Sequence, residues 1–281
     1  MPEEFDAVDI RCELQTRTAV ILGVTADIGR ELAKRLLNDG WQVFGIGRTK
    51  ERLGELNETS RCHFIPCDLT DRESILSATN ALGQTGAEWD LFISCAGTME
   101  PIGPFFSLDF DKWESSIVTN MTAQLRVLHA SWSFKRHGRI VDVMFLAGGG
   151  TNNPFRNYSA YCVSKIALIK MCELIDDEER DVNAFIIGPG FVPTRIHEET
   201  FRAGAAAGDG LGRTRTFLMS AGTSFDDIYT HMCWCMSAGR HVAGGRNFST
   251  VHDLWRDGGK GLLDSLPGDA NAYRLRRHQP G

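Results

Sequence analysis

The chain has 281 residues, of which 42% are hydrophobic and 23% charged, as in an ordinary globular protein with one large α/β domain. Its formal net charge of −6 argues against nucleic-acid binding, because a surface that contacts phosphates needs clustered lysine and arginine. No stretch approaches the roughly 18 apolar residues of a membrane span, and the start, MPEEFDAVDIRCELQTR, lacks a signal-peptide pattern. We therefore expect a cytoplasmic protein that binds neither nucleic acid nor membranes.

From Thr18 onward, short apolar runs alternate with helical patterns. The expected strands are the apolar, β-branched runs at 18–24, 41–47, 63–69, 90–97, 138–146 and 182–190. The expected helices have apolar residues at helical spacing and lie at 27–40, 49–58, 73–83, 113–134 and 159–179. This alternation predicts a doubly wound parallel sheet of the Rossmann type, with helices on both faces.

The organisation of the chain is predicted to be simple, because no internal repeat and no linker divides it. We expect one domain over 1–281, with a core at about 17–250 and an extended tail at 253–281. Residues 1–16, residues 202–214 and the tail are weakly patterned. The basic end, RLRRH from Arg274, predicts a solvated tail or a contact between subunits.

The cysteines predict packing and not metal binding. All eight are scattered along the chain, and without an export signal they are expected to be reduced and mostly buried thiols. Cys233 and Cys235 lie near His231 and His241, but the C-x-C spacing is too tight for a usual zinc pair, and Trp234 between them favours packing. We therefore expect no metal site.

A glycine-containing turn, Gly23-x-x-x-x-Ile28-Gly29, joins the first strand to the first helix. Glycines let the backbone approach a pyrophosphate, and the helix N-terminus offers free N–H groups and a positive dipole end. The placement therefore predicts a nucleotide-binding loop. Asp27 stands where a middle glycine is expected, and since its carboxylate would repel a phosphate, we expect it to cap the start of the helix.

The second strand ends at Gly47-Arg48-Thr49-Lys50. An acidic residue at this point would bind the ribose 2′-hydroxyl of NAD, whereas an arginine accommodates a 2′-phosphate. Arg48, with Lys50 close behind, therefore favours NADP(H) and leaves NAD(H) open. A surface arginine in a loop is the simpler alternative.

Further motifs follow in order. They are Asp68-Leu69, Ser94-Cys95-Ala96-Gly97, Asn120, Tyr161-x-x-x-Lys165 and Pro189-Gly190-x-x-x-Thr194. Together with the glycine turn they resemble the short-chain dehydrogenase/reductase family in its compact form, over about 17–250. The resemblance implies an NAD(P)(H)-dependent oxidoreductase that transfers hydride between nicotinamide and a carbonyl or secondary alcohol. The cofactor-binding residues that it implies are Gly23, Thr25, Asp27, Ile28, Gly29, Arg48, Asp68, Leu69, Ala96, Gly97, Lys165, Pro189, Gly190, Val192 and Thr194.

Tyr161 and Lys165 lie one helical turn apart. A tyrosine of ordinary pKa near 10 is a poor base at neutral pH, and an ammonium group on the same helical face is expected to lower that pKa. The resemblance implies that Tyr161 exchanges a proton with the substrate oxygen and that Lys165 reaches the nicotinamide ribose. It also implies that Asn120 holds a water molecule that relays protons.

The family's catalytic serine is missing. Its usual separation from Asn120 and Tyr161 leads to Ala147, with Gly148 as the near competitor. Thr151 and then Ser159 are the next hydroxyls, and Thr151 substitutes only if the glycine run folds back. Removing one such donor typically lowers turnover by about 10²–10³, so we expect an impaired or altered site that is still active.

The segment after Thr194 resembles the family's mobile substrate lid, at about 195–216. Its basic residues are expected to meet an anionic substrate, such as a nucleotide sugar or an acyl thioester, or to be solvated; they are Arg195, His197, Arg202, Arg213 and Arg215. Opposite them, Phe155, Arg156 and Tyr158 are expected to form the other wall of the substrate pocket.

The resemblance also implies a homodimer or homotetramer, because the family pairs subunits through its long helices. Two alternatives to the reductase stay open. One is a non-catalytic nucleotide-binding or scaffold subunit, against which stands the presence of both Tyr161 and Lys165. The other is a sugar-nucleotide-modifying member, suggested by the long C-terminal end.

Overall fold

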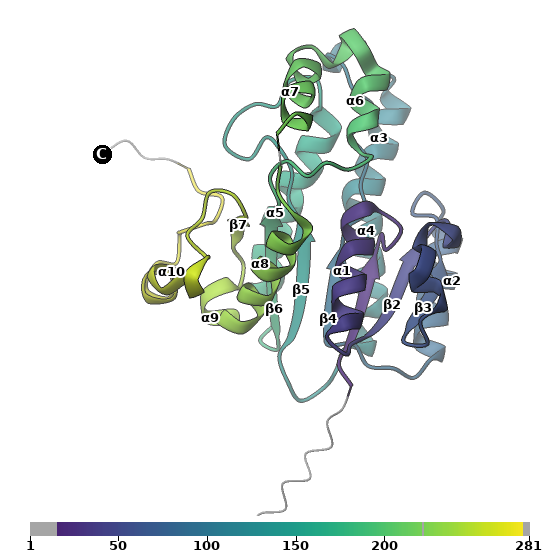
Figure 1. Ribbon diagram of the computed structural model, residues 1–281, viewed down its shortest axis with the longest axis vertical. Helices are drawn as coiled ribbons and strands as arrows, with labels where there is room; N and C mark the ends of the chain where they lie inside the picture. The colour runs from purple at the N-terminus through teal and green to yellow at the C-terminus, as the bar shows by residue number, and fades with distance from the viewer. Residues whose placement is uncertain (1–15, 221, 278–281) are drawn as a thin grey trace, which may run out of the picture.

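The computed structural model describes residues 16–220 and 222–277. Within them, seven parallel strands form a sheet in the order β3-β2-β1-β4-β5-β6-β7 (Figure 1). The strands are β1 (Thr18–Leu22), β2 (Gln42–Gly47), β3 (Cys62–Pro66), β4 (Leu91–Ser94), β5 (Val141–Leu146), β6 (Val182–Gly188) and β7 (Asn247–Ser249). The predicted doubly wound parallel sheet is confirmed, and its strand order reverses between β1 and β4.

Helices cover both faces of this sheet. The α-helices are α1 (Asp27–Asn38), α2 (Arg72–Gln84), α3 (Phe110–Ile117), α4 (Ala123–Ser131), α5 (Ser159–Glu178), α6 (His197–Ala203), α7 (Asp209–Leu218), α8 (Phe225–Ala238), α9 (Arg240–Ala243) and α10 (Lys260–Ser265). Short 3₁₀ turns lie at Lys50–Glu58, Phe105–Ser107, Trp132–Phe134, Gly204–Ala207, Asp257–Gly259 and Leu266–Gly268. No helix of the described residues combines the length and apolar character that crossing a membrane requires.

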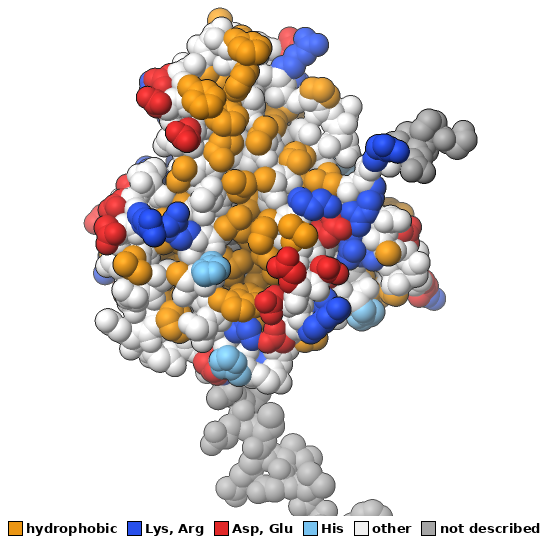
Figure 2. Space-filling model, turned by 180° about the vertical axis from the view of Figure 1, so that it is seen from behind, with side chains coloured by type: hydrophobic (Ala, Val, Ile, Leu, Met, Phe, Trp, Pro, Cys, Tyr) orange, Lys and Arg blue, Asp and Glu red, His pale blue; other side chains and the backbone are white. Residues whose placement is uncertain are grey.

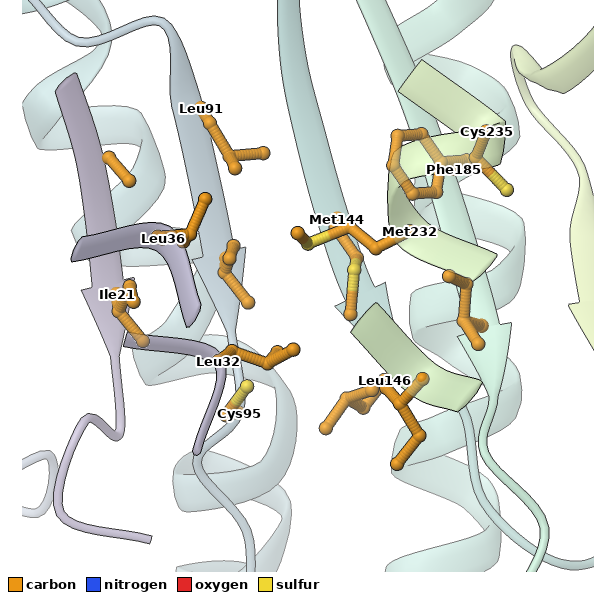
Figure 3. Packing of buried hydrophobic residues seen from close by; sticks show 14 of the residues in the cluster. Ile21, Leu32, Leu36, Leu91, Cys95, Met144, Leu146, Phe185, Met232 and Cys235 are labelled. Atoms are coloured by element: carbon orange, nitrogen blue, oxygen red, sulfur yellow. The ribbon is translucent and has the colours of Figure 1, made fainter. Parts of the chain in front are cut away.

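The core forms two layers because the strands are apolar on both sides. On β5, Met144 and Leu146 face the layer beneath α1 and α8, whereas Val143 and Phe145 face the layer beneath α2, α4 and α5. Figure 3 shows the first layer, where the α8 side chain of Met232 lies beside Met144. This double burial explains why the strands are continuous apolar runs in the sequence.

The long helix expected at 113–134 is interrupted. It consists of α3, a π-helical turn at Val118–Thr122, α4 and a 3₁₀ turn. The helix expected at 49–58 is a 3₁₀ segment, in which Gly54 leaves the helical conformation with a φ of 58°. Conversely, the weakly patterned stretch 202–214 is mostly helical, and the three-residue strand β7 is too short to give a period in the sequence.

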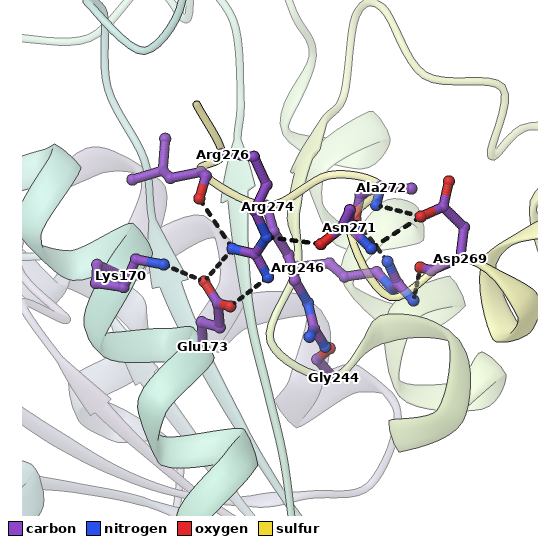
Figure 4. Close-up of polar contacts among 10 residues, drawn as sticks. Lys170, Glu173, Gly244, Arg246, Asp269, Asn271, Ala272, Arg274 and Arg276 are labelled. Carbon is purple, nitrogen blue, oxygen red and sulfur yellow. Dashed lines mark hydrogen bonds and ion pairs between the residues drawn. The ribbon is translucent and has the colours of Figure 1, made fainter. Parts of the chain in front are cut away.

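The C-terminal tail folds back onto the sheet edge (Figure 4). The Asn247 N–H of β7 donates to the Tyr273 carbonyl at 2.8 Å. The buried guanidinium of Arg246 donates to the carbonyls of Leu266, Asp269 and Ala272 at 2.7, 2.9 and 2.5 Å. The tail therefore covers the exposed edge of the last strand, which is where a sheet is otherwise open to pairing with another chain.

The basic end of the chain is tied down as well. The Arg276 Nη2 donates to Glu173 Oε1 of α5 at 2.6 Å, and Arg274 Nη2 donates to the Gly244 carbonyl at 3.0 Å. Hydrogen bonds from Arg276 hold the pKa of Glu173 down to about 2, against the effect of burial and with help from Lys170. Arg274 and Arg276 are therefore tied to the rest of the chain, in contrast to a freely solvated tail, and a contact between subunits stays a prediction. His278 and the acidic start lie outside the described residues.

The two arginines of the tail predict unequal effects on stability. Arg246→Met removes the donor of three carbonyls beneath the tail and should lower the free energy of unfolding by about 3 kcal/mol. Arg276→Met breaks an ion pair in which the arginine side chain is 35% exposed, so it should cost less than about 1 kcal/mol. Urea unfolding measures both, and equal losses would contradict this ranking.

Candidate active site

The carboxyl ends of β1, β4, β5 and β6 border a cavity of about 650 Å³. It lies at the point where the strand order reverses, which is where open α/β sheets bind ligands. Most of the predicted site residues line it: Gly23, Thr25, Asp27, Ile28, Arg48, Asp68, Leu69, Ala96, Gly97, Ala147, Tyr161, Lys165, Pro189, Gly190, Val192 and Thr194. Gly29 and Asn120 do not line the cavity but lie next to residues that do, Gly29 beside Gly23 and Asn120 beside Thr98.

Two glycines allow the turn after β1 to form. Gly23 has a φ of +82°, and a Cβ atom at this position would lie 2.6 Å from the Ala96 nitrogen. A Cβ atom at Gly29 would lie 2.2 Å from the Gly23 carbonyl oxygen. Because both positions must lack a side chain, the backbone at the start of α1 stays open to the cavity. This cradle fits the pyrophosphate of a dinucleotide.

Asp27 does not cap α1 as expected. The N-cap residue is Ala26, with no side-chain cap. Instead, Asp27 accepts hydrogen bonds from the Arg195 backbone N–H at 2.7 Å and from Arg195 Nε at 2.8 Å. Burial alone would raise the pKa of the carboxyl, but the hydrogen bonds and charge of Arg195 lower it. Asp27 is therefore an ionised partner of a residue far away in the sequence.

Two arginines line the cavity beyond the carboxyl end of β2. Arg48 lines it as expected, whereas Arg52 takes the place expected for Lys50. Arg48 reaches the cavity from just after β2, and Arg52 reaches it from the 3₁₀ segment that follows. Nearby, Asp68 Oδ1 accepts from the Thr70 N–H at 2.9 Å, which is the main reason that its pKa is lowered.

Asn120 is a fully buried tie between two segments. Its Oδ1 accepts from the Thr98 N–H at 2.9 Å, and its Nδ2 donates to the Thr98 carbonyl at 2.8 Å and to Ser116 Oγ at 3.1 Å. Both amide hydrogens are thus used by the protein, so the side chain has no donor left for the water expected there. Instead, Asn120 fixes the turn after β4 that forms one wall of the cavity.

Tyr161 and Lys165 face the cavity from the first turns of α5. Lys165 Nζ lies 5.8 Å from the centre of the Tyr161 ring and donates to the Leu146 carbonyl at 2.9 Å. Burial lowers the pKa of Lys165 to about 8, opposed by the nearby Cys95 thiol. Burial also raises the pKa of Tyr161, assisted by Cys162 and Glu199. The expected lowering by Lys165 is therefore wrong for this state, because burial dominates.

The structure distinguishes the two positions considered for the missing serine. A Cβ atom at Gly148 would lie 2.5 Å from the Tyr161 hydroxyl oxygen, so position 148 directs its side chain at the phenol. Ala147 is only 5% exposed and packs in the core layer beneath α5. Ala147 also lines the cavity, but the geometry favours Gly148 as the position from which a side chain would face the phenol. The phenol of Tyr161 occupies the space next to this glycine.

The two hydroxyls proposed as substitutes have other neighbours. Thr151 Oγ1 points to the Gly148 carbonyl, at 3.5 Å. Ser159 Oγ accepts from the indole N–H of Trp113 at 3.0 Å. The glycine run turns back, as Thr151 substitution requires, but it directs the hydroxyl at the backbone and not at the phenol.

The lid segment contributes an acidic residue that sequence reasoning missed. Glu199 Oε2 accepts from the Met99 N–H at 2.5 Å, the Thr98 hydroxyl at 3.1 Å and the Glu100 N–H at 3.2 Å. Arg202 Nε pairs with Glu100 Oε1 at 3.3 Å. These contacts tie α6 to the turn after β4. Glu and Arg at helical spacing gave no local signal, because their partners lie about 100 residues away.

The prediction of a second cavity wall is wrong, because Phe155, Arg156 and Tyr158 do not belong to the lining of the cavity; Phe155 and Tyr158 pack beneath the lid segment. Phe155 and Tyr158 stack at 4.2 Å, and the Tyr158 hydroxyl lies 3.0 Å from Thr200 Oγ1 of α6. They form a separate small apolar cluster with lid residues, and Arg213 covers the Phe155 ring. Of the basic lid residues, Arg195, His197 and Arg202 line the cavity; Arg213 and Arg215 do not belong to its lining.

His231 is part of an aromatic cluster. Its ring stacks on Trp255 at 4.5 Å, and its Nδ1 lies 3.0 Å from Thr250 Oγ1. Burial lowers its pKa to about 3, so the ring is neutral. Across residues 16–220 and 222–277 there is no group of three or more His, Cys, Asp or Glu side chains arranged to hold a metal ion.

Comparison with known proteins gives a family match. The model of the short chain dehydrogenase family matches residues 17–204. A serine 3-dehydrogenase from Rhizobium radiobacter is 25% identical over 232 residues, which cover 80% of this chain and 90% of that protein. A probable NADP-dependent dehydrogenase from Haemophilus influenzae is 28% identical over 140 residues, which cover 48% of this chain and 56% of that protein.

A similar fold is found among solved structures. A short chain dehydrogenase/reductase from Saccharomyces cerevisiae superposes with a TM-score of 0.74 at 20% identity. The similarity covers 89% of this chain and all of that one. At this level of identity, the comparison supports the fold alone.

The buried ammonium of Lys165 predicts a pH-dependent loss of stability. Its folded pKa of about 8 lies below its usual unfolded value of about 10.4. Between these values the unfolded chain binds the extra proton, so stability rises with pH and the full cost applies below pH 8. Lys165→Met should therefore raise the free energy of unfolding at pH 7 by about 2 kcal/mol.

This gain should shrink between pH 8 and 10, as measured by urea unfolding of the protein without cofactor. Lys34→Met, at an exposed position of α1, is the matched control and should change little. A Lys165→Met protein that is less stable than the wild type at pH 7 would contradict the prediction.

Proposed function

The chain belongs to the short chain dehydrogenase family, and we propose that it is an NAD(P)(H)-dependent oxidoreductase that reduces a carbonyl or oxidises a secondary alcohol. The observation that carries the proposal is the meeting of Tyr161 and Lys165 at the cavity beside the β1 turn. Membership of an oxidoreductase family supports the reaction class, and the chemistry of these two side chains supports the mechanism.

The cofactor would supply or accept the hydride. Tyr161 would give its proton to the substrate oxygen as the carbonyl carbon becomes an alcohol carbon, and would take it back in the reverse reaction. Because burial raises the pKa of Tyr161, the phenol holds its proton at neutral pH. Lys165 keeps a positive charge next to the phenol and would bind the ribose hydroxyls.

We propose NADP(H) as the preferred cofactor. The turn after β1 fits the pyrophosphate, and Arg48 and Arg52 supply two guanidinium groups at the other end of the cavity. Guanidinium groups bind phosphate oxygens through paired, charge-assisted hydrogen bonds. The relative from Haemophilus influenzae is named a probable NADP-dependent dehydrogenase, which is consistent with this choice.

We further propose that the protein works as a homo-oligomer in a reducing, cytoplasmic compartment. Figure 2 shows hydrophobic side chains gathered in a band on the face opposite the view of Figure 1. The face covered by α2, α4 and α5 carries exposed Val163 and Leu174 on α5, and Phe110 of the adjoining α3 is also exposed. A second copy would cover such a surface. The described cysteines are free thiols.

The position of the missing hydroxyl can be tested by restoring it. Gly148→Ser should raise kcat for carbonyl reduction by about 10², because it returns a hydrogen-bond donor to the substrate oxygen. The Tyr161 ring has to move to admit the new side chain, so part of the usual effect is lost. The measurement is steady-state NADPH oxidation over a panel of ketones.

Ala147→Ser is the matched control, since it adds the same hydroxyl one residue away and should leave kcat within about threefold. Rescue by Ala147→Ser alone would overturn the assignment to Gly148. Tyr161→Phe should abolish turnover in either background. Cofactor binding without turnover in the wild type and in Gly148→Ser would favour the non-catalytic alternative.

The cofactor preference depends on Arg48. Arg48→Ala should weaken NADPH binding by about 10- to 100-fold, since it removes charge-assisted hydrogen bonds to the 2′-phosphate, and should leave NADH binding nearly unchanged. Lys50→Ala is the control and should affect neither. Fluorescence titration measures both affinities, and equal weakening for NADH and NADPH would contradict the role given to Arg48.

A further inference from the structure

A carboxylate lies at the anion-binding end of α1. Asp27 belongs to the first turn of this helix, where unpaired N–H groups and the helix dipole favour negative charge. Its side chain is 17% exposed and lines the cavity. Both carboxylate oxygens are already bound, since Oδ2 accepts from the Arg195 N–H, and Oδ1 accepts from Nε at 2.8 Å and lies 2.7 Å from Nη2.

Arg195 makes a further contact to the same turn. Its Nη2 lies 3.2 Å from the Thr25 carbonyl oxygen. The guanidinium therefore spans the β1 turn while it remains 42% exposed and within the cavity lining. The planar fork of a guanidinium pairs with a carboxylate or a phosphate in the same manner. The Arg195 guanidinium is therefore a group of the kind that binds phosphate, and its partner in this structure is the Asp27 carboxylate.

Arg195 also begins a strap across the cavity. From Arg195 the chain enters α6, whose Glu199 is bound to the Met99 and Glu100 N–H groups of the opposite turn. Residues 195–202 are therefore held at one end by the turn after β1 and at the other by the turn after β4. A ligand that binds between these turns has to bind beside the Asp27–Arg195 ion pair or displace it.

We propose that the Asp27 carboxylate competes with the cofactor pyrophosphate for the Arg195 guanidinium. Arg195 is then a pyrophosphate-binding residue that pairs with Asp27 when no cofactor is bound. The proposal rests on the proposed cofactor function. When a dinucleotide binds, Arg195 exchanges the Asp27 carboxylate for phosphate oxygens, and the strap stays attached through the ligand. Asp27 thereby sets a lower cofactor affinity than the site would have with a neutral residue.

A four-member mutant cycle tests this exchange. Wild type, Asp27→Asn, Arg195→Ala and the double variant are titrated with NADPH by fluorescence. Asp27→Asn should tighten binding by about tenfold, because the competing charge is gone. Adding Arg195→Ala to Asp27→Asn should weaken it by about tenfold. If Arg195 only neutralised Asp27, Arg195→Ala would leave the affinity of the Asp27→Asn protein unchanged, and the proposal would be overturned.

A ligand without a pyrophosphate serves as the control. Adenosine 2′-monophosphate should bind all four proteins with equal affinity, because it does not reach Arg195. Changes that were as large for adenosine 2′-monophosphate as for NADPH would indicate a general distortion of the site and would overturn the proposal.

Limited trypsin digestion gives a readout that is independent of affinity. Without cofactor, cleavage after Arg202, whose side chain in the strap is 60% exposed, should be faster in Asp27→Asn than in the wild type, because the strap has lost one attachment. NADPH should slow this cleavage in Asp27→Asn but not in the double variant. Equal protection of both by NADPH would count against Arg195 as the ligand.

Failure of the inference can be told apart from failure of the proposed function. If neither NADPH nor NADH binds to any of the four proteins, both are overturned. If they bind and the Arg195→Ala step has no effect in the Asp27→Asn background, only the exchange at Arg195 is overturned.

Discussion

The close approach of Gly23 to the Ala96 backbone is the constraint around which the site is built. At the point where the strand order reverses, the turns after β1 and β4 come so near each other that position 23 has no room for a side chain. The second turn is held from behind, where Gln124 Nε2 donates to the Ala96 carbonyl at 2.9 Å and Asn120 binds Thr98. A rigid pair of turns is what allows α1 to present its free N–H groups to a ligand.

The fold could be predicted because most of its strands and helices produce local patterns in the sequence. Strands buried on both faces appear as apolar runs, and amphipathic helices separate them. β7 escaped prediction because its three residues are held by partners that are distant in the sequence, namely β6 and the Tyr273 carbonyl of the tail. The π-helical turn around Asn120 was missed for the same reason, since it serves a contact with Thr98 that lies 22 residues away.

Most residues of the site could be predicted from the sequence, but their side-chain directions, pKa shifts and distant partners could not. Motif spacing identified Tyr161 and Lys165. It favoured Ala147 over Gly148 for the missing serine, whereas the geometry favours Gly148, because a chain leaving a strand end redirects each successive side chain. Neighbouring charge predicted a lowered pKa for Tyr161, whereas burial raises it. The partner of Asp27 lies 168 residues away, and no local pattern reports such a distance.

The electrostatics of Lys165 fit the role proposed for it. Its ammonium is buried, and the acceptor of its hydrogen bond is the neutral Leu146 carbonyl. Desolvation without a carboxylate partner makes this group a cost to folding, as its lowered pKa of about 8 records. The other two unusual positions of the site are compensated within the chain. Arg195 pairs with the negative charge of Asp27, and Tyr161 fills the space beside Gly148. A buried charge that lines the cavity without a carboxylate partner is consistent with the cofactor-binding role proposed for Lys165.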